Sequence, residues 1–136
     1  MTASLQFGQI VWAEVADANG IRKPRPAIII TPTDRISPSG TLEVVAITSR
    51  LAQPLPEDHV LLPWHPRGHP RTGLTRKCAA VCTWLSRISE SDIQNVAGLV
   101  PGPILLTILS KIAAAQPAPQ TPPDNAQSSQ NNNNGS

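Results

Sequence analysis

The sequence lacks the features that mark several large classes of protein. Its 136 residues include only 2 cysteines, and 11 basic side chains against 9 acidic ones leave a net charge of +2. No apolar run approaches the roughly 18 residues that a membrane-spanning helix needs. The first residues, MTASLQFGQ, have neither a cationic nor a strongly apolar stretch, so we expect no secretory signal. Length and composition therefore exclude a multidomain enzyme, a disulfide scaffold and a strongly basic packaging protein, and they favour one small cytoplasmic domain.

The C-terminal segment differs in composition from the rest of the chain. From Gln116 it reads QPAPQTPPDNAQSSQNNNNGS, with no aliphatic side chain larger than alanine. Such a segment cannot bury enough apolar surface to offset the entropy cost of ordering it. We therefore predict a folded domain at residues 1–115 and a disordered Pro-, Gln- and Asn-rich tail at residues 116–136.

Hydrophobic periodicity predicts five short strands followed by helices. The strand candidates, read from alternating or continuous apolar residues, are 8–16, 27–31, 41–49, 59–64 and 78–86. The second strand is expected to begin only at Ala27, because Pro24 and Pro26 cannot donate hydrogen bonds to a neighbouring strand. Cys78 and Cys82, in the fifth strand, are expected to be buried thiols.

The periodicity changes after the fifth strand. Ser89 to Asp92 matches a capping box, which predicts a short helix ending near Gly98. Pro103 opens a second helix with apolar residues at 3.6-residue spacing. This order predicts a mainly β fold of the α+β class, in which a small bent sheet or barrel packs against a C-terminal helix.

Four segments in a fixed order carry a family resemblance. GQIVWAEV, KPRPAIII, VVAITS and TGLTRKCAAVCTWLSRI follow one another over about residues 7–113. The most specific pieces are Arg25–Pro26 before an aliphatic strand, the AITS that ends the third strand, and the Thr-Gly-Leu before the fifth. In this order the chain resembles the MazF/PemK family of toxin endoribonucleases from type II toxin–antitoxin systems. The resemblance implies an SH3-like barrel of about five strands, MazF/PemK/CcdB-like, that acts as a homodimer.

The resemblance also implies an activity. Members of that family cleave single-stranded RNA, including mRNA, at specific sequences without a metal or other cofactor, and a cognate antitoxin protein inhibits them. Arg25 and Thr48 match the family's functional arginine and threonine. A guanidinium can hold two phosphate oxygens in a fixed fork and a hydroxyl can orient a third, so both residues suit catalysis by 2′-hydroxyl attack. Arginine is a poor proton donor, so we expect Arg25 to act mainly by electrostatic stabilisation.

Two cationic segments, one with Arg22, Lys23 and Arg25 and the other at residues 65–77, are candidate RNA-binding surfaces. They would form one groove if they flanked the same mouth of the barrel. His65 and His69 could also supply a general base, but the prolines and glycine around them prevent the helix that would turn both toward one metal ion. Trp64 is the best candidate for base stacking, whereas Trp12 and Trp84 alternate with core positions and are expected to be packing residues. The predicted RNA-binding set is Arg22, Lys23, Trp64, His65, His69, Arg71, Arg76 and Lys77.

The chain departs from the family pattern in its fifth strand. Thr83 stands where many members have an acidic residue, and Val81 stands where one branch has arginine. Cys78 replaces the serine of a common Lys-Asp-Ser motif. A general base taken from that branch therefore has no counterpart, and the acid and base stay unassigned.

Two alternatives to a nuclease remain open at this level. One is a barrel that binds a partner protein, as the CcdB-type gyrase poisons do, although the Asn-rich end differs from the short Trp-Gly-Ile ending of those proteins. The other is an RNA-binding barrel that does not cut. Strands that are apolar on both faces also predict a two-fold homodimer, because monomers rarely expose large apolar patches.

Overall fold

The computed structural model describes residues 5–36 and 40–115. The predicted tail at 116–136 lies outside the described residues. Within the described part, six strands, two 3-10 turns and one helix follow one another. They are β1 (Gln9–Ala16), β2 (Arg22–Ile29), η1 (Thr33–Arg35), β3 (Thr41–Thr48), β4 (His59–Leu61), β5 (Ala79–Ser89), η2 (Glu90–Asp92), β6 (Ile93–Leu99) and α1 (Gly102–Ala115).

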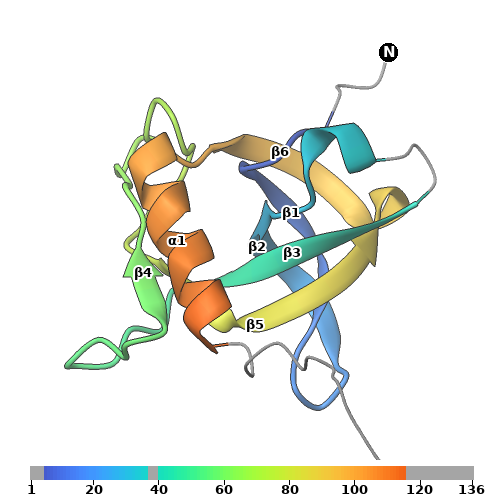
Figure 1. Ribbon diagram of the computed structural model, residues 1–136. Coiled ribbons are helices and arrows are strands. Elements are labelled where there is room, and N and C mark those ends of the chain that lie inside the picture. Colours follow the sequence, from blue (N-terminus) through green and yellow to red (C-terminus); the bar gives the residue numbers. More distant parts are fainter. Residues whose placement is uncertain (1–4, 37–39, 116–136) are drawn as a thin grey trace, which may run out of the picture.

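The six strands form one antiparallel sheet in the order β4-β5-β3-β2-β1-β6. The sheet is strongly curled, and α1 lies beside β4 at one side of it (Figure 1). A mainly β fold with a C-terminal helix is thus confirmed. None of the helices in the described residues is long and apolar enough to cross a membrane.

Two apolar clusters cover the two faces of this sheet. The first packs against α1, whose Leu105 and Ile108 are buried, as the predicted stripe requires. The second lies on the opposite face and includes three small residues, Ala13, Ala27 and Ala46. These alanines leave room for a large side chain above them, and the indole of Trp84 packs against this cluster. We call the face of the second cluster the alanine face.

The start of β2 differs from the prediction. The strand begins at Arg22, not at Ala27, and pairs with β1 from Arg22 to Ile28. Pro24 and Pro26 are accommodated because the pairs between β2 and β3 begin only at Ala27, so one side of the proline segment has no strand beside it. This arrangement holds Arg25 in a regular strand.

The prediction of a short helix after residue 89 is wrong. The capping box at Ser89 and Asp92 does form, but it closes only the 3-10 turn η2, after which the chain continues as β6. Strand β6 pairs with β1, whose outer side would otherwise be an open sheet edge. Tertiary pairing has therefore overridden the local helix signal.

A bulge interrupts the fifth strand at its middle. Ala80 pairs with Ile47 and Leu85 with Val45, so four residues of β5 stand against one of β3. Thr83 and Trp84 lie within this bulge and leave the regular ladder. Cys78 and Cys82 are buried free thiols, as predicted, and burial raises the pKa of Cys78 to about 11.

Candidate functional site

Arg25 is held in place by three contacts. Its Nε donates a hydrogen bond to the Val15 carbonyl at 3.2 Å. One terminal nitrogen lies 3.8 Å from a carboxylate oxygen of Asp17, and the guanidinium lies over the ring of Trp84, 4.9 Å from its centroid. The Arg25 side chain is 23% exposed to solvent. The guanidinium is therefore fixed in orientation while part of it stays accessible to solvent.

The turn between β1 and β2 fixes the carboxylate beside Arg25. Asp17 accepts hydrogen bonds from the backbone N–H groups of Asn19 and Ile21, and Gly20 supplies the positive φ of 79° that the turn needs. The hydrogen bond from Ile21 lowers the pKa of Asp17, with further lowering from Arg25. The carboxylate consequently stays ionised and acts as a constant partner for the guanidinium.

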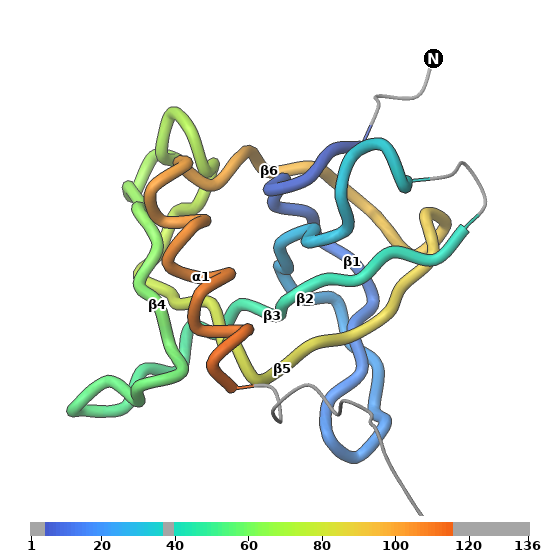
Figure 2. The backbone as a smooth tube through the Cα atoms, in the orientation of Figure 1, coloured from blue at the N-terminus to red at the C-terminus, as the bar shows by residue number. Residues whose placement is uncertain are grey.

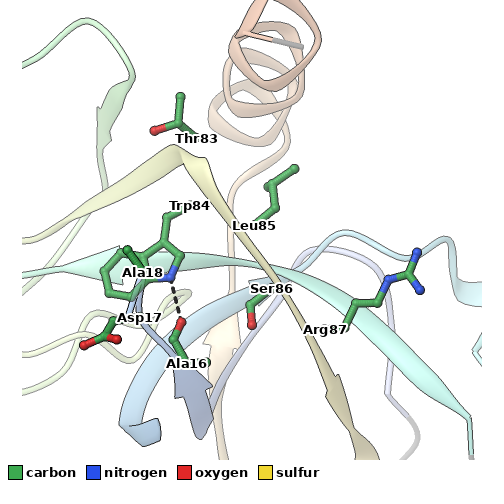
Figure 3. A pocket seen from close by; sticks show the side chains of 8 residues that line it. All are labelled: Ala16, Asp17, Ala18, Thr83, Trp84, Leu85, Ser86 and Arg87. Carbon is green, nitrogen blue, oxygen red and sulfur yellow. Dashed lines mark hydrogen bonds between the residues drawn. The ribbon is translucent and has the colours of Figure 1, made fainter. Parts of the chain in front are cut away.

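Trp84 joins the bulge of β5 to the end of β1. Its Nε1 donates to the Ala16 carbonyl at 3.0 Å, a contact drawn as a dashed line in Figure 3. Strands β5 and β1 are separated by two others in the sheet, so this bond shows that the sheet closes over its alanine face. The sequence-based expectation that Trp84 packs in the core is confirmed, and its stacking on Arg25 is an additional role that the expectation did not include.

A groove of about 750 Å³ opens beside Asp17 and Trp84, the two side chains that contact Arg25. One wall comes from the β1–β2 turn and the other from the bulge and second half of β5 (Figure 3). Trp84, Leu85 and two alanines make much of the lining apolar, and Leu85 is 38% exposed. The lining residues are Ala16, Asp17, Ala18, Thr83, Trp84, Leu85, Ser86 and Arg87.

Thr48 lies on the same face of the sheet as Arg25. Directly paired residues project to one face, and so do residues two apart in a strand. Ala27 pairs with Ala46 in antiparallel register, so Arg25 and Thr48, each two residues from its paired alanine in the same direction across the sheet, both lie on the alanine face at the same level. The Thr48 hydroxyl oxygen accepts the N–H of Arg50 at 3.1 Å. The structure thus brings the two predicted catalytic residues to the same level of one face.

An acidic group that the sequence did not reveal sits beside Thr83. The Thr83 hydroxyl donates to one carboxylate oxygen of Asp58, and the other oxygen lies 2.8 Å from Nδ1 of His59. These two hydrogen bonds lower the pKa of Asp58, that from Thr83 contributing most. Thr83, which stands where many family members have an acidic residue, therefore contacts the carboxylate of Asp58, the residue just before β4. No spacing rule could have found this contact, because it joins residues 25 apart through the bulge.

The cationic loop at residues 65–77 has a dense internal hydrogen-bond network. His65 accepts the N–H of Arg67, and His69 accepts those of Arg71 and Thr72, through Nδ1 in both cases. The buried Thr72 donates to the Pro63 carbonyl at 2.8 Å. Both histidines thus serve as turn acceptors, which favours a structural role over acid–base chemistry.

The remaining predicted RNA-binding residues are divided between two places. Arg22 lies near the turn and pairs with Asp92 at 2.8 Å, while Lys23 beside it is exposed. On the loop, Arg71, Arg76 and Lys77 are exposed. Trp64, at the start of the same loop region, is 41% exposed. Figures 1 and 2 show the loop and the β1–β2 turn at opposite sides of the molecule. One subunit therefore does not bring the two cationic segments around one mouth.

Two further expectations can be compared with the structure. Trp12 is 38% exposed on β1, so its assignment as a packing residue is wrong for the isolated chain. Among residues 5–36 and 40–115, His, Cys, Asp and Glu side chains form no group of three that could hold a metal ion.

Comparison with known proteins agrees with this architecture. Residues 6–115 match the model of a family described as the PemK-like, MazF-like toxin of type II toxin–antitoxin systems. No curated protein sequence matches the chain.

Solved structures share the fold at low sequence identity. MazF from Deinococcus radiodurans is 19% identical with a TM-score of 0.64, over 83% of this chain and 96% of that one. The MazE–MazF complex of the same organism (Form-II) gives 17% and 0.60, over 83% and 95% of the two chains. An endoribonuclease from a mycobacterial species gives 15% and 0.59, over 84% and 92%. Because the family model covers most of the chain, this protein belongs to the PemK-like, MazF-like toxins of type II toxin–antitoxin systems.

Proposed function

We propose that this chain is a sequence-specific endoribonuclease that cleaves single-stranded RNA, including mRNA, without a metal ion. The observation that carries the proposal is the restrained guanidinium of Arg25 at the same level of one sheet face as Thr48. Donors that are held in place before the reaction lose little free energy to reorganisation when charge develops. Relatives of the same fold include proteins described as endoribonucleases.

The chemistry follows from what the two residues offer. The 2′-hydroxyl of the RNA loses its proton, and its oxygen attacks the adjacent phosphorus while the bond to the 5′-oxygen breaks. Arg25 neutralises charge on the phosphate oxygens as the phosphorane forms, and the Thr48 hydroxyl orients the phosphate. The reaction leaves a 2′,3′-cyclic phosphate and a 5′-hydroxyl end and consumes no water.

The groove beside Trp84 suits a single-stranded substrate. Unpaired bases stack on aromatic surfaces, and the apolar lining from Trp84 and Leu85 offers such a surface next to Arg25. We assign phosphate contacts outside the groove to Lys23, Arg71, Arg76 and Lys77, with Arg22 available in addition. Trp64 offers a second stacking surface, and His65 and His69 shape the loop that presents it.

The proposed partners are a cognate antitoxin and a second copy of the chain. Solved relatives include a MazE–MazF complex and an endoribonuclease bound to its cognate antitoxin. A homodimer would cover exposed apolar side chains such as Trp12 and Leu106, and it would place loops of both subunits on a shared surface. Light scattering at micromolar concentration should give twice the monomer mass of 14.5 kDa.

An assay of a long single-stranded RNA in the presence of EDTA tests the proposal. The wild-type protein should cut it into fragments that end in 2′,3′-cyclic phosphate, whereas Arg25→Ala should leave the RNA intact although the protein folds normally. Cleavage that requires an added divalent ion would contradict the metal-independent mechanism. Thr83 in place of an acidic residue favours one alternative, an RNA-binding protein that does not cut, and retention of intact RNA in the gel would identify it.

A further inference from the structure

The proposed reaction needs a group that removes a proton from the 2′-hydroxyl. Arg25 is always protonated and cannot accept one. Asp17, the nearest acidic group to Arg25, is occupied by two backbone N–H groups and the guanidinium. Since its pKa is also lowered, Asp17 is a weak base. The base must therefore come from another part of the alanine face.

A histidine–aspartate pair lies at the start of β4. The Nδ1 of His59 is 2.8 Å from an Asp58 oxygen, and because an ionised carboxylate only accepts hydrogen bonds, Nδ1 carries the proton. The lone pair of the neutral ring is then on Nε2. Within the part of the chain that the structure describes, Nε2 of His59 makes no hydrogen bond. The ring is thus held in the tautomer that can take a proton.

His59 lies on the same sheet face as Arg25 and Thr48. Leu61 of β4 and Thr48 of β3 both pair with Ala79 of β5, so Leu61 and Thr48 share a face. His59 is two residues from Leu61 and shares that face, whereas Val60 between them packs on the opposite side with the cluster under α1. Only β5 separates β4 from β3 in the sheet, so the axes of these two strands lie about 10 Å apart.

The bulge of β5 links this pair to the groove. Thr83 lines the groove and holds Asp58 through its hydroxyl, and its neighbour Trp84 stacks on Arg25. The Cys82 N–H donates to the Asp58 carbonyl at 2.7 Å and fixes the backbone of the pair. The side chains of His59 and Asp58 keep 15% and 32% of their exposure. The pair is therefore joined to the groove through Thr83, one of its lining residues, and is not sealed from solvent.

We propose that His59 is the general base of this enzyme and that Asp58 is the residue that positions it. This inference rests on the proposed function. Nε2 of His59 takes the proton of the 2′-hydroxyl, the O2′–P bond forms, and the P–O5′ bond breaks. The resulting imidazolium, stabilised by the Asp58 carboxylate, returns its proton to the leaving 5′-oxygen, so that no proton is gained or lost overall. The pair supplies from β4 the acid–base function that Val81 and Thr83 of β5 cannot supply.

Other titratable groups around the pair have separate roles. Cys82 of β5 is buried, which raises its pKa and keeps the thiol protonated at neutral pH. Lys111 of α1 donates its ammonium hydrogen to the Glu57 carbonyl at 2.8 Å. These neighbours are therefore not available as the base, and His59 is the imidazole that the carboxylate of Asp58 holds in place.

Single-turnover cleavage of a short single-stranded RNA, measured from pH 5 to 9, tests the proposal. His59→Gln should lower the rate about 100-fold at pH 7 and remove the rise of the rate with pH, while RNA affinity stays within about threefold. Asp58→Asn should lower the rate about tenfold and move that rise to lower pH, because the imidazolium loses its anionic partner. Asp34→Asn, a matched change on the exposed turn η1, should behave as wild type.

The outcomes separate this inference from the proposed function. If wild type cuts and Arg25→Ala does not, but His59→Gln keeps the wild-type rate and pH profile, the pair has no part in proton transfer and the inference is overturned. An unchanged pH profile in Asp58→Asn overturns the positioning role in the same way. If wild type itself leaves RNA intact, the proposed function fails first. Should His59→Gln fold poorly by circular dichroism, His59→Ala with added imidazole replaces it, and recovery of cleavage with imidazole supports the base while no recovery contradicts it.

Discussion

The surroundings of Arg25 and the loop at residues 65–77 are both cationic, yet they are built in opposite ways. The loop has more basic side chains, and its hydrogen bonds hold its own backbone, so that Arg71, Arg76 and Lys77 project into solvent. In β2, by contrast, the contacts from Val15, Asp17 and Trp84 restrain the guanidinium of Arg25 itself. In the proposed function, orientation, and not the number of charges, distinguishes the reactive guanidinium from the RNA-binding loop.

The loop nevertheless requires a defined shape. Its backbone docks tightly on β6, where a Cβ on Gly98 would come within 2.2 Å of the Arg71 carbonyl oxygen. The Leu99 N–H donates to that same carbonyl at 2.7 Å. A loop that is fixed in this way can present its charges in constant positions even though the charged groups themselves are not restrained.

Replacing the guanidinium while keeping its charge should have the largest effect. Arg25→Lys retains a cation but cannot donate to the Val15 carbonyl, lie flat on Trp84 and hold two phosphate oxygens together. We expect the cleavage rate to fall about 100-fold, which is typical for the loss of one preorganised donor. A single-turnover assay measures the rate, and a melting curve serves as the folding control. A rate within threefold of wild type would show that charge alone suffices at this position.

Removing one hydroxyl from the loop should instead affect stability. Thr72→Val keeps the shape of a buried side chain but leaves the Pro63 carbonyl and the Leu74 N–H without their partner. We expect a loss of about 1–3 kcal/mol in the free energy of unfolding, measured with urea, and little change in cleavage by the protein that remains folded. Thr75→Val, at an exposed position of the same loop, is the matched control and should cost less than about 0.5 kcal/mol.

The sequence allowed most of the fold to be predicted, and the errors have physical causes. Strands β1 and β3 and the apolar stripe of α1 follow from local periodicity, which tertiary contacts reinforce. The helix expected after Ser89 failed because the capping box is compatible with a single turn, while the open edge of β1 needed a partner strand. A local pattern reports what a segment can form, but not which edge elsewhere in the chain it will complete.

The candidate site was predictable only in part for the same reason. Arg25 and Thr48 are candidates from the sequence because each lies in a short recognisable segment. The contact between Asp58 and Thr83 depends on a bulge in β5, and a bulge shifts register without leaving a periodicity of its own. The stacking of Trp84 on Arg25 likewise joins two strands that are not adjacent in the sheet.

Thr48 offers a smaller test of the strand-end site. Thr48→Val keeps the β-branched shape and removes only the hydroxyl, which also accepts the Arg50 N–H in an exposed turn. Loss of one hydrogen bond from the threonine hydroxyl to the phosphate should lower the cleavage rate about tenfold, corresponding to about 1.4 kcal/mol. Thr48→Ser, which restores the hydroxyl, should recover most of the rate. A defect in Thr48→Ser together with a wild-type rate in Thr48→Val would mean that the methyl group matters and not the hydroxyl.

The smallest effect is expected for charges on the loop. Each phosphate contact made by a basic side chain steepens the dependence of RNA affinity on salt by about 0.7 in log–log slope for a single strand. The double variant Arg76→Gln, Lys77→Gln should therefore reduce the slope by up to about 1.4 and weaken binding severalfold at low salt, while the cleavage rate of bound RNA stays unchanged. Arg35→Gln, in the exposed turn η1, is the matched control because its charge lies outside both cationic segments. If the double variant lowers the rate of bound RNA as strongly as Arg25→Lys does, the loop contributes to the chemical step, and the distinction between an oriented guanidinium and a set of exposed charges is wrong.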